Sequence, residues 1–257
     1  MMPPVKGFIA AIKLLTVFPI DTRNRIPAGS MGWTLCCFPA IGLLLGGICA
    51  AVLRVGMGLF PAAVASALSV FALALCTGGL HLDGLADTAD GLFGGRTREQ
   101  RLEIMRDTHI GSFGVIALVA FLGLKVLALE GIALISCDRA IGTVLLMPVT
   151  GRWIILMAAG MCGYAREEEG TGRRFVEAAR LTHFAVCAPF VALCAWWFLG
   201  VGGLLMLGVL LVAAPLLILY IRARIGGMTG DTLGAMCETT EVLFLISFFV
   251  SRQADLF

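Results

Sequence analysis

The sequence predicts an all-α, polytopic integral membrane protein, a bundle of about seven transmembrane helices that forms a single domain over residues 1–257. Of these residues 59% are hydrophobic and only 14% are charged, against roughly a quarter charged in soluble domains. Apolar segments of about twenty residues are long enough to cross roughly 30 Å of hydrocarbon. We place them at 36–53, 59–79, 111–135, 140–160, 183–200, 203–221 and 232–250.

The distribution of Lys and Arg predicts the orientation of these spans. If the N-terminus is cytoplasmic, 14 of the 19 Lys and Arg residues, including Arg23 and Arg25, lie in segments on the cytoplasmic side, and three lie in segments on the other side. This asymmetry is the one that the positive-inside rule describes. The long polar stretches 81–109 and 164–182 then both face the cytoplasm, so we expect the active site at that face.

Six carboxylates gather in two short segments, each of which borders an apolar run. They are Asp83, Asp87 and Asp90 in the segment 78–95, and Asp231, Glu238 and Glu241 in the segment 226–241. At 100° per residue the first three lie within about 60° of one helical face, and the second three within about 80°. Because carboxylates at the border of a bilayer are costly, their presence indicates function.

Carboxylates at this spacing repel one another unless a cation lies between them. Mg²⁺ is the simplest candidate, since it takes one or two carboxylates per ion together with water and substrate phosphates. Six carboxylates suffice for two ions about 4 Å apart, a geometry that clamps a diphosphate. We therefore expect all six to be metal ligands and the two segments to meet as half-sites. A solvated acidic helix face is the plainer alternative, and the second acidic segment argues against it.

The segment that opens the third predicted span is rich in glycine and hydroxyl groups, and it follows a run of arginines. Free amides at the N-terminus of a helix, with the positive end of its dipole, suit a phosphate, and the arginines add charge-assisted bonds. Close helix packing is the alternative role for the glycines. We expect substrate-binding residues at Arg96, Asp107, Gly111, Ser112, Arg152 and Thr229.

Two cationic residues fall inside the predicted spans. Arg152 lies in the fourth span, where an arginine needs an anion, and either a carboxylate of the two clusters or a substrate phosphate meets that need. Lys125 falls near the outer end of the third span, from which its ammonium group is expected to reach the membrane surface.

Three segments resemble the signature segments of the cobalamin synthase family, the adenosylcobinamide-GDP ribazoletransferases. They are GGLHLDGLADTADGLFGG, RDTHIGSFG and GGMTGDTLGAMCETTE, and the earlier LTVFPI and FPAIGLLLGG resemble that family's N-terminal region. The likeness runs from about residue 14 to 245, with 183–220 matching in hydropathy only. The resemblance implies a Mg²⁺-dependent enzyme of the bacterial cell inner membrane that acts late in cobalamin biosynthesis.

The implied reaction joins α-ribazole, or its 5′-phosphate, to adenosylcobinamide-GDP and releases GMP. A ribose hydroxyl attacks the phosphorus attached to cobinamide, and catalysis of such a transfer is mostly positioning and electrostatic stabilisation. The expected catalytic residues are His81, Asp83, Asp87 and Asp90, and His81 or one of the six carboxylates takes the proton from the hydroxyl. The lipid bilayer is an expected partner and nucleic acid is not. A homo-oligomer is possible, and the sequence does not decide it.

Two other classes of protein remain alternatives at this point. The CDP-alcohol type of membrane phosphotransferase also uses an aspartate-rich helix with metal, but Asp87 stands where that family's pattern has an arginine. A cation transporter binds its ion with intramembrane acids near the midplane, whereas both clusters here lie toward one leaflet.

Overall fold

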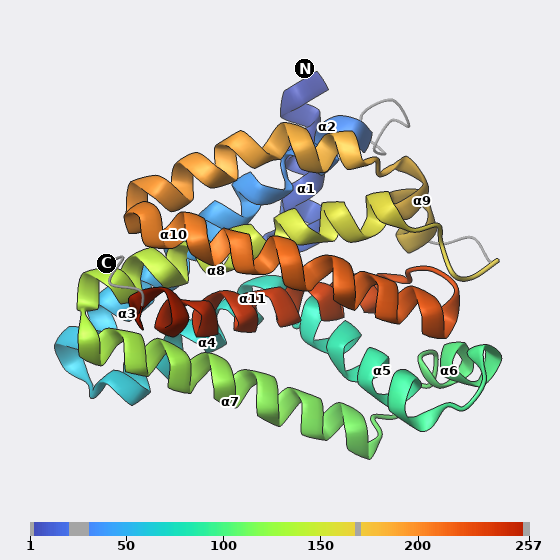
Figure 1. Ribbon diagram of the computed structural model, residues 1–257, viewed down its shortest axis with the longest axis horizontal. Helices are drawn as coiled ribbons and strands as arrows, with labels where there is room; N and C mark the ends of the chain where they lie inside the picture. The colour runs from blue at the N-terminus through green and yellow to red at the C-terminus, as the bar shows by residue number, and fades with distance from the viewer. Residues whose placement is uncertain (1–2, 21–30, 168–170, 254–257) are drawn as a thin grey trace.

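The computed structural model describes residues 3–20, 31–167 and 171–253, and within them it is built from α-helices (Figure 1). The helices are α1 (Pro3–Leu15), α2 (Met31–Cys36), α3 (Phe38–Leu59), α4 (Ala62–Thr77), α5 (Leu80–Gly94), α6 (Arg98–Ile104), α7 (Ser112–Ile135), α8 (Cys137–Met161), α9 (Thr171–Ala178), α10 (Leu181–Ile225) and α11 (Gly230–Gln253). The described part contains no strand beyond a single bridge between Tyr164 and Met228. The prediction of an all-α helical membrane protein is confirmed.

The predicted count of seven spans is not confirmed. Five helical segments are long and apolar enough to cross a membrane, namely Met31–Leu59, α7, α8, α10 and α11, and the bent pair α4 and α5 makes a sixth if it counts as one span. Helix α10 covers two of the predicted spans in 45 residues and is broken at Gly200, where φ is 65° and ψ is −147°. The chain turns back there, so α10 forms a hairpin (Figure 1).

A sharp bend separates α4 from α5, whose axes differ by 91°. Gly78 and Gly79 form the bend with φ of 62° and 73°, a left-handed conformation that glycine adopts without steric cost. The apolar α4 ends there, and the aspartate-bearing α5 leaves in a new direction to pack against α7 and α11. The glycine pair thus places the first acidic segment on a helix of its own.

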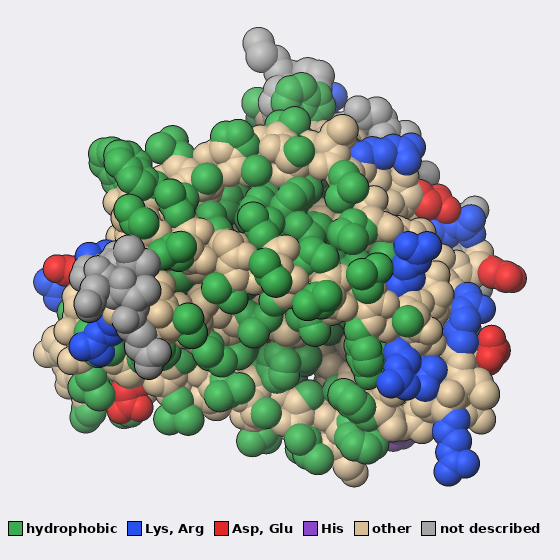
Figure 2. Space-filling view, viewed as in Figure 1, with side chains coloured by type: hydrophobic (Ala, Val, Ile, Leu, Met, Phe, Trp, Pro, Cys, Tyr) green, Lys and Arg blue, Asp and Glu red, His purple; other side chains and the backbone are tan. Residues whose placement is uncertain are grey.

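Helix α8 forms the centre of the bundle and packs against α3, α10 and α11. Of the residues in its 18-residue apolar stretch, 89% are buried inside the protein. Side chains on the face shown in Figure 2 are largely hydrophobic, and many Lys and Arg side chains gather at the end that carries α6 and α9. The predicted orientation of this end toward the cytoplasm stays a prediction. Arg23 and Arg25, which also entered that prediction, lie outside the described residues.

Candidate active site

The two acidic segments meet where α5 crosses the beginning of α11. The crossing is close because glycine stands on both helices: a Cβ at Gly84 would lie 2.7 Å from the backbone oxygen of Asp231, and one at Gly234 would lie 3.2 Å from Cα of His81. A side chain at either glycine would push the helices apart. The expectation that the two segments meet is therefore fulfilled at Asp231.

Three aspartates gather at this crossing with little positive charge to balance them. Asp83 is exposed, while Asp87 and Asp231 are half-buried. The carboxylate of Asp87 is acted on by the negative charges of Asp83, Asp231 and Asp90, and by the positive charge of Arg166. Like charges at this range disfavour one another, so the group has a net demand for a cation.

Arg166 is a site residue that our sequence analysis did not single out. Its Nη2 donates a hydrogen bond to Oδ2 of Asp231 at 2.9 Å. The chain reaches this place because the segment around Tyr164 pairs with the segment before α11: the amide of Ala165 donates to the Met228 carbonyl, and the amide of Met228 to the Gly163 carbonyl, both at 2.9 Å. The 164–182 loop is mixed in charge, with four Arg and four Glu, so its composition gave no signal for such a residue.

Thr229 supports Asp231 rather than standing free for a substrate. Its hydroxyl lies 3.3 Å from Oδ2 of Asp231, and its amide donates to Oγ1 of Thr232 at 2.8 Å. The amide of Thr232 donates in turn to Oγ1 of Thr229 at 3.2 Å. These bonds satisfy free groups at the start of α11, as helix caps do. Thr229 is fully buried, and its observed contacts support Asp231.

Asp90 caps the N-terminus of α7. Its carboxylate accepts hydrogen bonds from the amides of Gly111 at 2.7 Å and Gly114 at 2.9 Å, where the helix dipole also favours a negative charge. A Cβ at either glycine would collide with the carboxylate. The amide of Gly111 that we expected to bind phosphate is thus occupied, and the packing alternative describes both glycines. Ser112, the first residue of α7, stays exposed.

A buried network of charges lies deeper between α5, α7, α8 and α11. Nζ of Lys125 donates to Oε2 of Glu238 at 2.6 Å and also to Glu241. Arg152 donates to the other carboxylate oxygen of Glu241, and its Nη2 lies 3.2 Å from Nδ1 of His81. All five side chains are buried. Two cations and two carboxylates therefore neutralise one another inside the protein.

This network bears on three expectations and corrects the one for Lys125. Glu238 and Glu241, predicted as Mg²⁺ ligands, already have cationic partners. Lys125 does not reach the membrane surface, because it faces the bundle interior and is only 2% exposed. Arg152 has found a carboxylate, the first of its two suggested partners, and its full burial separates it from any phosphate at the surface.

The same contacts define the hydrogen-bonding role of His81. Since a guanidinium group only donates, Nδ1 of His81 must accept from Arg152, and a neutral ring then carries its hydrogen on Nε2. In this arrangement His81 presents a donor at Nε2, which favours a carboxylate over His81 as the acceptor of the substrate's proton. No described residue bonds to Nε2.

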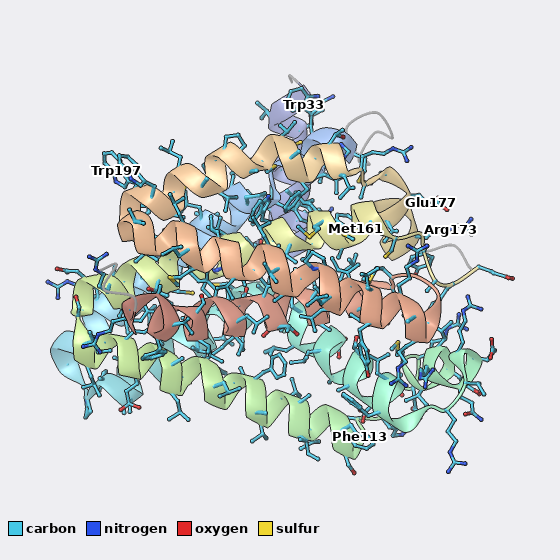
Figure 3. All side chains as sticks on the ribbon, viewed as in Figure 1. Trp33, Phe113, Met161, Arg173, Glu177 and Trp197 are labelled. Atoms are coloured by element: carbon cyan, nitrogen blue, oxygen red, sulfur yellow. The ribbon has the colours of Figure 1, made fainter. Side chains whose placement is uncertain are left out.

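The remaining predicted residues lie on the polar segments around α6. Arg96 is exposed. Asp107 is also exposed, and its Oδ1 accepts from the amide and from Nδ1 of His109 at 3.0 and 2.7 Å. These bonds hold the pKa of Asp107 below its usual range, so the carboxylate stays charged in weakly acidic solution. Phe113 marks the adjoining start of α7 in Figure 3.

Helix α6 is fixed to the end of the bundle by arginines. Nε of Arg98 donates to the Ile225 carbonyl at 2.9 Å and its Nη2 to the Ala165 carbonyl at 2.7 Å. Because these carbonyls lie at the end of α10 and next to Arg166, Arg98 ties α6 to the loop that carries Arg166. Another basic side chain at this end, Arg173 on α9, forms an ion pair with Glu177 at 2.7 Å (Figure 3).

The donor set at the crossing of α5 and α11 suits Mg²⁺ better than the buried glutamates do. Among the described residues no three His, Cys, Asp or Glu side chains form a ready-made ion site. Mg²⁺ does not require one, because it commonly takes one or two carboxylates and completes its shell with water and substrate phosphates. Asp83 and Asp87 offer oxygens that no described cation occupies, and Asp231 shares one oxygen with Arg166.

The fold and the site define a polytopic helical membrane protein with an under-neutralised carboxylate group at one end of its bundle. Comparison with known proteins then identifies the family. The chain belongs to the cobalamin-5-phosphate synthase family, whose model matches residues 7–249. The resemblance found in the signature segments is thereby confirmed, and the phosphotransferase and transporter alternatives are set aside.

Named relatives cover almost the whole chain. The adenosylcobinamide-GDP ribazoletransferase of Acetivibrio thermocellus is 34% identical over 98% of this chain and 100% of its own length. Proteins of the same name from Desulforamulus reducens and Chlorobium phaeobacteroides are 38% and 39% identical, over 92% and 95% of this chain and 94% and 97% of their own lengths. No solved structure matches the chain.

Proposed function

We propose that this protein is a Mg²⁺-dependent adenosylcobinamide-GDP ribazoletransferase. A ribose hydroxyl of α-ribazole, or of its 5′-phosphate, forms a bond to the phosphorus attached to cobinamide, the bond from that phosphorus to the oxygen of GMP breaks, and adenosylcobalamin or its 5′-phosphate results. One observation carries the proposal: in a chain of this family, three aspartates with a net demand for a cation meet where α5 crosses α11.

The residues at the crossing divide the work between them. Asp83 and Asp87 would hold Mg²⁺, which when bound neutralises the diphosphate and the charge that develops on the departing GMP. Asp231 completes the group, and Thr229 and Arg166 fix its carboxylate. A carboxylate of this group accepts the proton of the attacking hydroxyl, since His81 presents a donor.

The proposed location is the bacterial inner membrane, with the acidic site toward the cytoplasm. The support is the collection of Lys and Arg at the end of the bundle that carries α6 and α9, together with the positive-inside rule. Thiol labelling of intact cells tests it in a protein without native cysteines. Cysteine in place of the exposed Arg96 or Arg174 should resist an impermeant reagent, while cysteine in place of the exposed Arg54 should react. The reverse pattern would contradict the orientation.

The activity is tested with the purified protein in lipid vesicles. Adenosylcobinamide-GDP and α-ribazole should yield GMP and a cobalamin product in the presence of Mg²⁺, and a chelator should stop the reaction. GMP release that needs no α-ribazole would indicate a hydrolase. Absence of GMP release with both substrates and Mg²⁺ present would overturn the proposal.

A further inference from the structure

A cavity of about 220 Å³ lies beside the acidic group, between α1, α3, α5, α8, α9 and α11. Its walls are mainly apolar and include Leu14, Leu15, Phe38, Ile155, Phe175 and Leu233. The rings of Phe38 and Phe175 stack there with centroids 5.1 Å apart and planes 22° apart. None of these side chains belongs to the acidic group, so the cavity has no assigned role yet.

The polar lining of the cavity is restricted to three side chains, His81, Asp83 and Asp231. His81 is only 4% exposed, and its Nδ1 is engaged by Arg152. The remaining ring atom, Nε2–H, is thus a donor without a partner among the described residues, on a side chain that lines the cavity. A ligand with one acceptor atom would bond to it.

Size and charge restrict what can occupy the cavity. Its volume of about 220 Å³ falls below the roughly 300–1,000 Å³ of clefts that enclose drug-sized ligands, so it matches a small ring system better than a corrin. The carboxylates of Asp83 and Asp231 at its lining disfavour a phosphate that lacks a cation. Apolar walls would leave the several polar atoms of a guanine base unpaired. A flat, mostly apolar bicycle with one acceptor nitrogen meets all of these conditions.

We propose that this cavity binds the benzimidazole base of the acceptor nucleoside, with its free ring nitrogen accepting a hydrogen bond from Nε2–H of His81. The inference rests on the proposed function and adds to it a subsite and a positioning residue. The base packs among the apolar walls, and the ribose lies toward Asp83 and Asp231 at the same cavity. The attacking hydroxyl is then delivered to the carboxylates that accept its proton.

Cavity-filling variants test the subsite. Leu14→Trp enlarges a half-buried side chain of α1, and Leu15→Phe is a second, smaller change on the same wall. We expect each to raise the KM for α-ribazole at least about tenfold, to weaken α-ribazole binding by a similar factor in calorimetry, and to leave the KM for adenosylcobinamide-GDP within about twofold.

The chain offers a matched control in a second cavity, of about 230 Å³, between α5, α7, α10 and α11. Ala117→Leu enlarges a half-buried side chain there and should leave both KM values unchanged. Unchanged KM and binding of α-ribazole in both α1 variants would overturn the inference while the wild-type protein still releases GMP. A wild-type protein that releases no GMP would instead overturn the proposed function.

The hydrogen bond from His81 is tested on the wild-type protein by changing the substrate. An indole riboside has the same shape as the benzimidazole riboside but replaces the acceptor nitrogen with CH. We expect it to bind about tenfold or more weakly, because it offers no acceptor to Nε2–H of His81. His81→Phe should abolish this difference between the two nucleosides. Equal binding of both nucleosides to the wild-type protein would contradict the role of His81.

Discussion

Two groups of carboxylates in this molecule differ in how their charge is balanced. In the buried group, Glu238 and Glu241 face Lys125 and Arg152, so two negative charges meet two positive ones. At the crossing of α5 and α11, three aspartates are balanced among the described residues by Arg166 alone. The first group is complete without a ligand, whereas the second gains from a cation. From this difference in charge balance we expect a structural role for the first group and a binding role for the second.

The comparison also predicts opposite responses to mutation. Removing one member of a buried ion network leaves a partner charged and unpaired in a low-dielectric surrounding, which is strongly destabilising. Removing a charge from a group of like charges relieves repulsion in the protein without ligand. Mutations in the buried group should therefore change mainly stability, and mutations in the group at the crossing should change mainly activity.

The largest effect is expected for Lys125→Met. It leaves Glu238 and Glu241 with one cation between them, and we expect a loss of about 3–5 kcal/mol in the free energy of unfolding, measured by thermal denaturation in detergent. The exposed Lys13→Met serves as the control and should be nearly neutral. Adding Glu238→Gln to Lys125→Met should restore a large part of the stability. A Lys125→Met protein as stable as wild type would show that the buried charge network does not have a structural role.

Asp87→Asn should cut turnover a hundredfold or more, equivalent to roughly 3 kcal/mol of transition-state stabilisation. The change removes a charge that helps to attract Mg²⁺, and excess Mg²⁺ should restore part of the activity. The melting temperature should stay the same or rise, because repulsion from Asp83 and Asp231 is relieved. Normal turnover in Asp87→Asn would show that this carboxylate belongs to a solvated helix face.

Asp90→Asn, three residues further along α5, should behave differently from Asp87→Asn. The asparagine oxygen can replace only one of the two carboxylate oxygens that accept from the amides of Gly111 and Gly114, and the charge at the helix terminus is lost. We expect a loss of about 1 kcal/mol in the free energy of unfolding, seen as a lower melting temperature. An unchanged melting temperature with a large loss of Mg²⁺ affinity would instead assign Asp90 to the metal.

The smallest effect is expected for Arg166→Gln. Arg166 competes with Mg²⁺ for the charge of Asp231, so its removal should lower the Mg²⁺ concentration for half-maximal activity about threefold, in line with the ~0.7 kcal/mol of a partly exposed ion pair. Titration of activity against Mg²⁺ measures this. A higher Mg²⁺ requirement would mean that Arg166 supports the metal site through its hold on Asp231.

Features set by short-range sequence were predicted well. The helical spacing of Asp83 and Asp87 placed both on one face of α5, and the two acidic segments meet at Asp231 as expected. The close contact of Gly84 and Gly234 that allows this crossing was not predicted. The helical membrane class followed from composition. These features depend on neighbours within one or two turns of a helix, or on the average of the whole chain.

Features set by the packing of distant helices were not predictable from spacing. Hydropathy did not indicate which face of α7 points into the bundle. The sequence therefore did not reveal that Lys125 contacts Glu238, 113 residues away. Glu238 and Glu241 looked like unpaired carboxylates, and hence like metal ligands, because the sequence did not show that their cationic partners on α7 and α8 lie beside them. Arg166 reaches Asp231 through backbone pairing between two loops, a long-range contact that local patterns do not encode.

The buried network has a consequence for the synthesis and membrane insertion of the protein. Lys125 and Arg152 are synthesised well before their partners, since Glu238 and Glu241 follow Lys125 by 113 and 116 residues. At about 5–20 residues per second, a translocating chain carries two unpaired cations in α7 and α8 for on the order of ten seconds. We therefore expect the insertion of α7 and α8 to be completed only when α11 is in place.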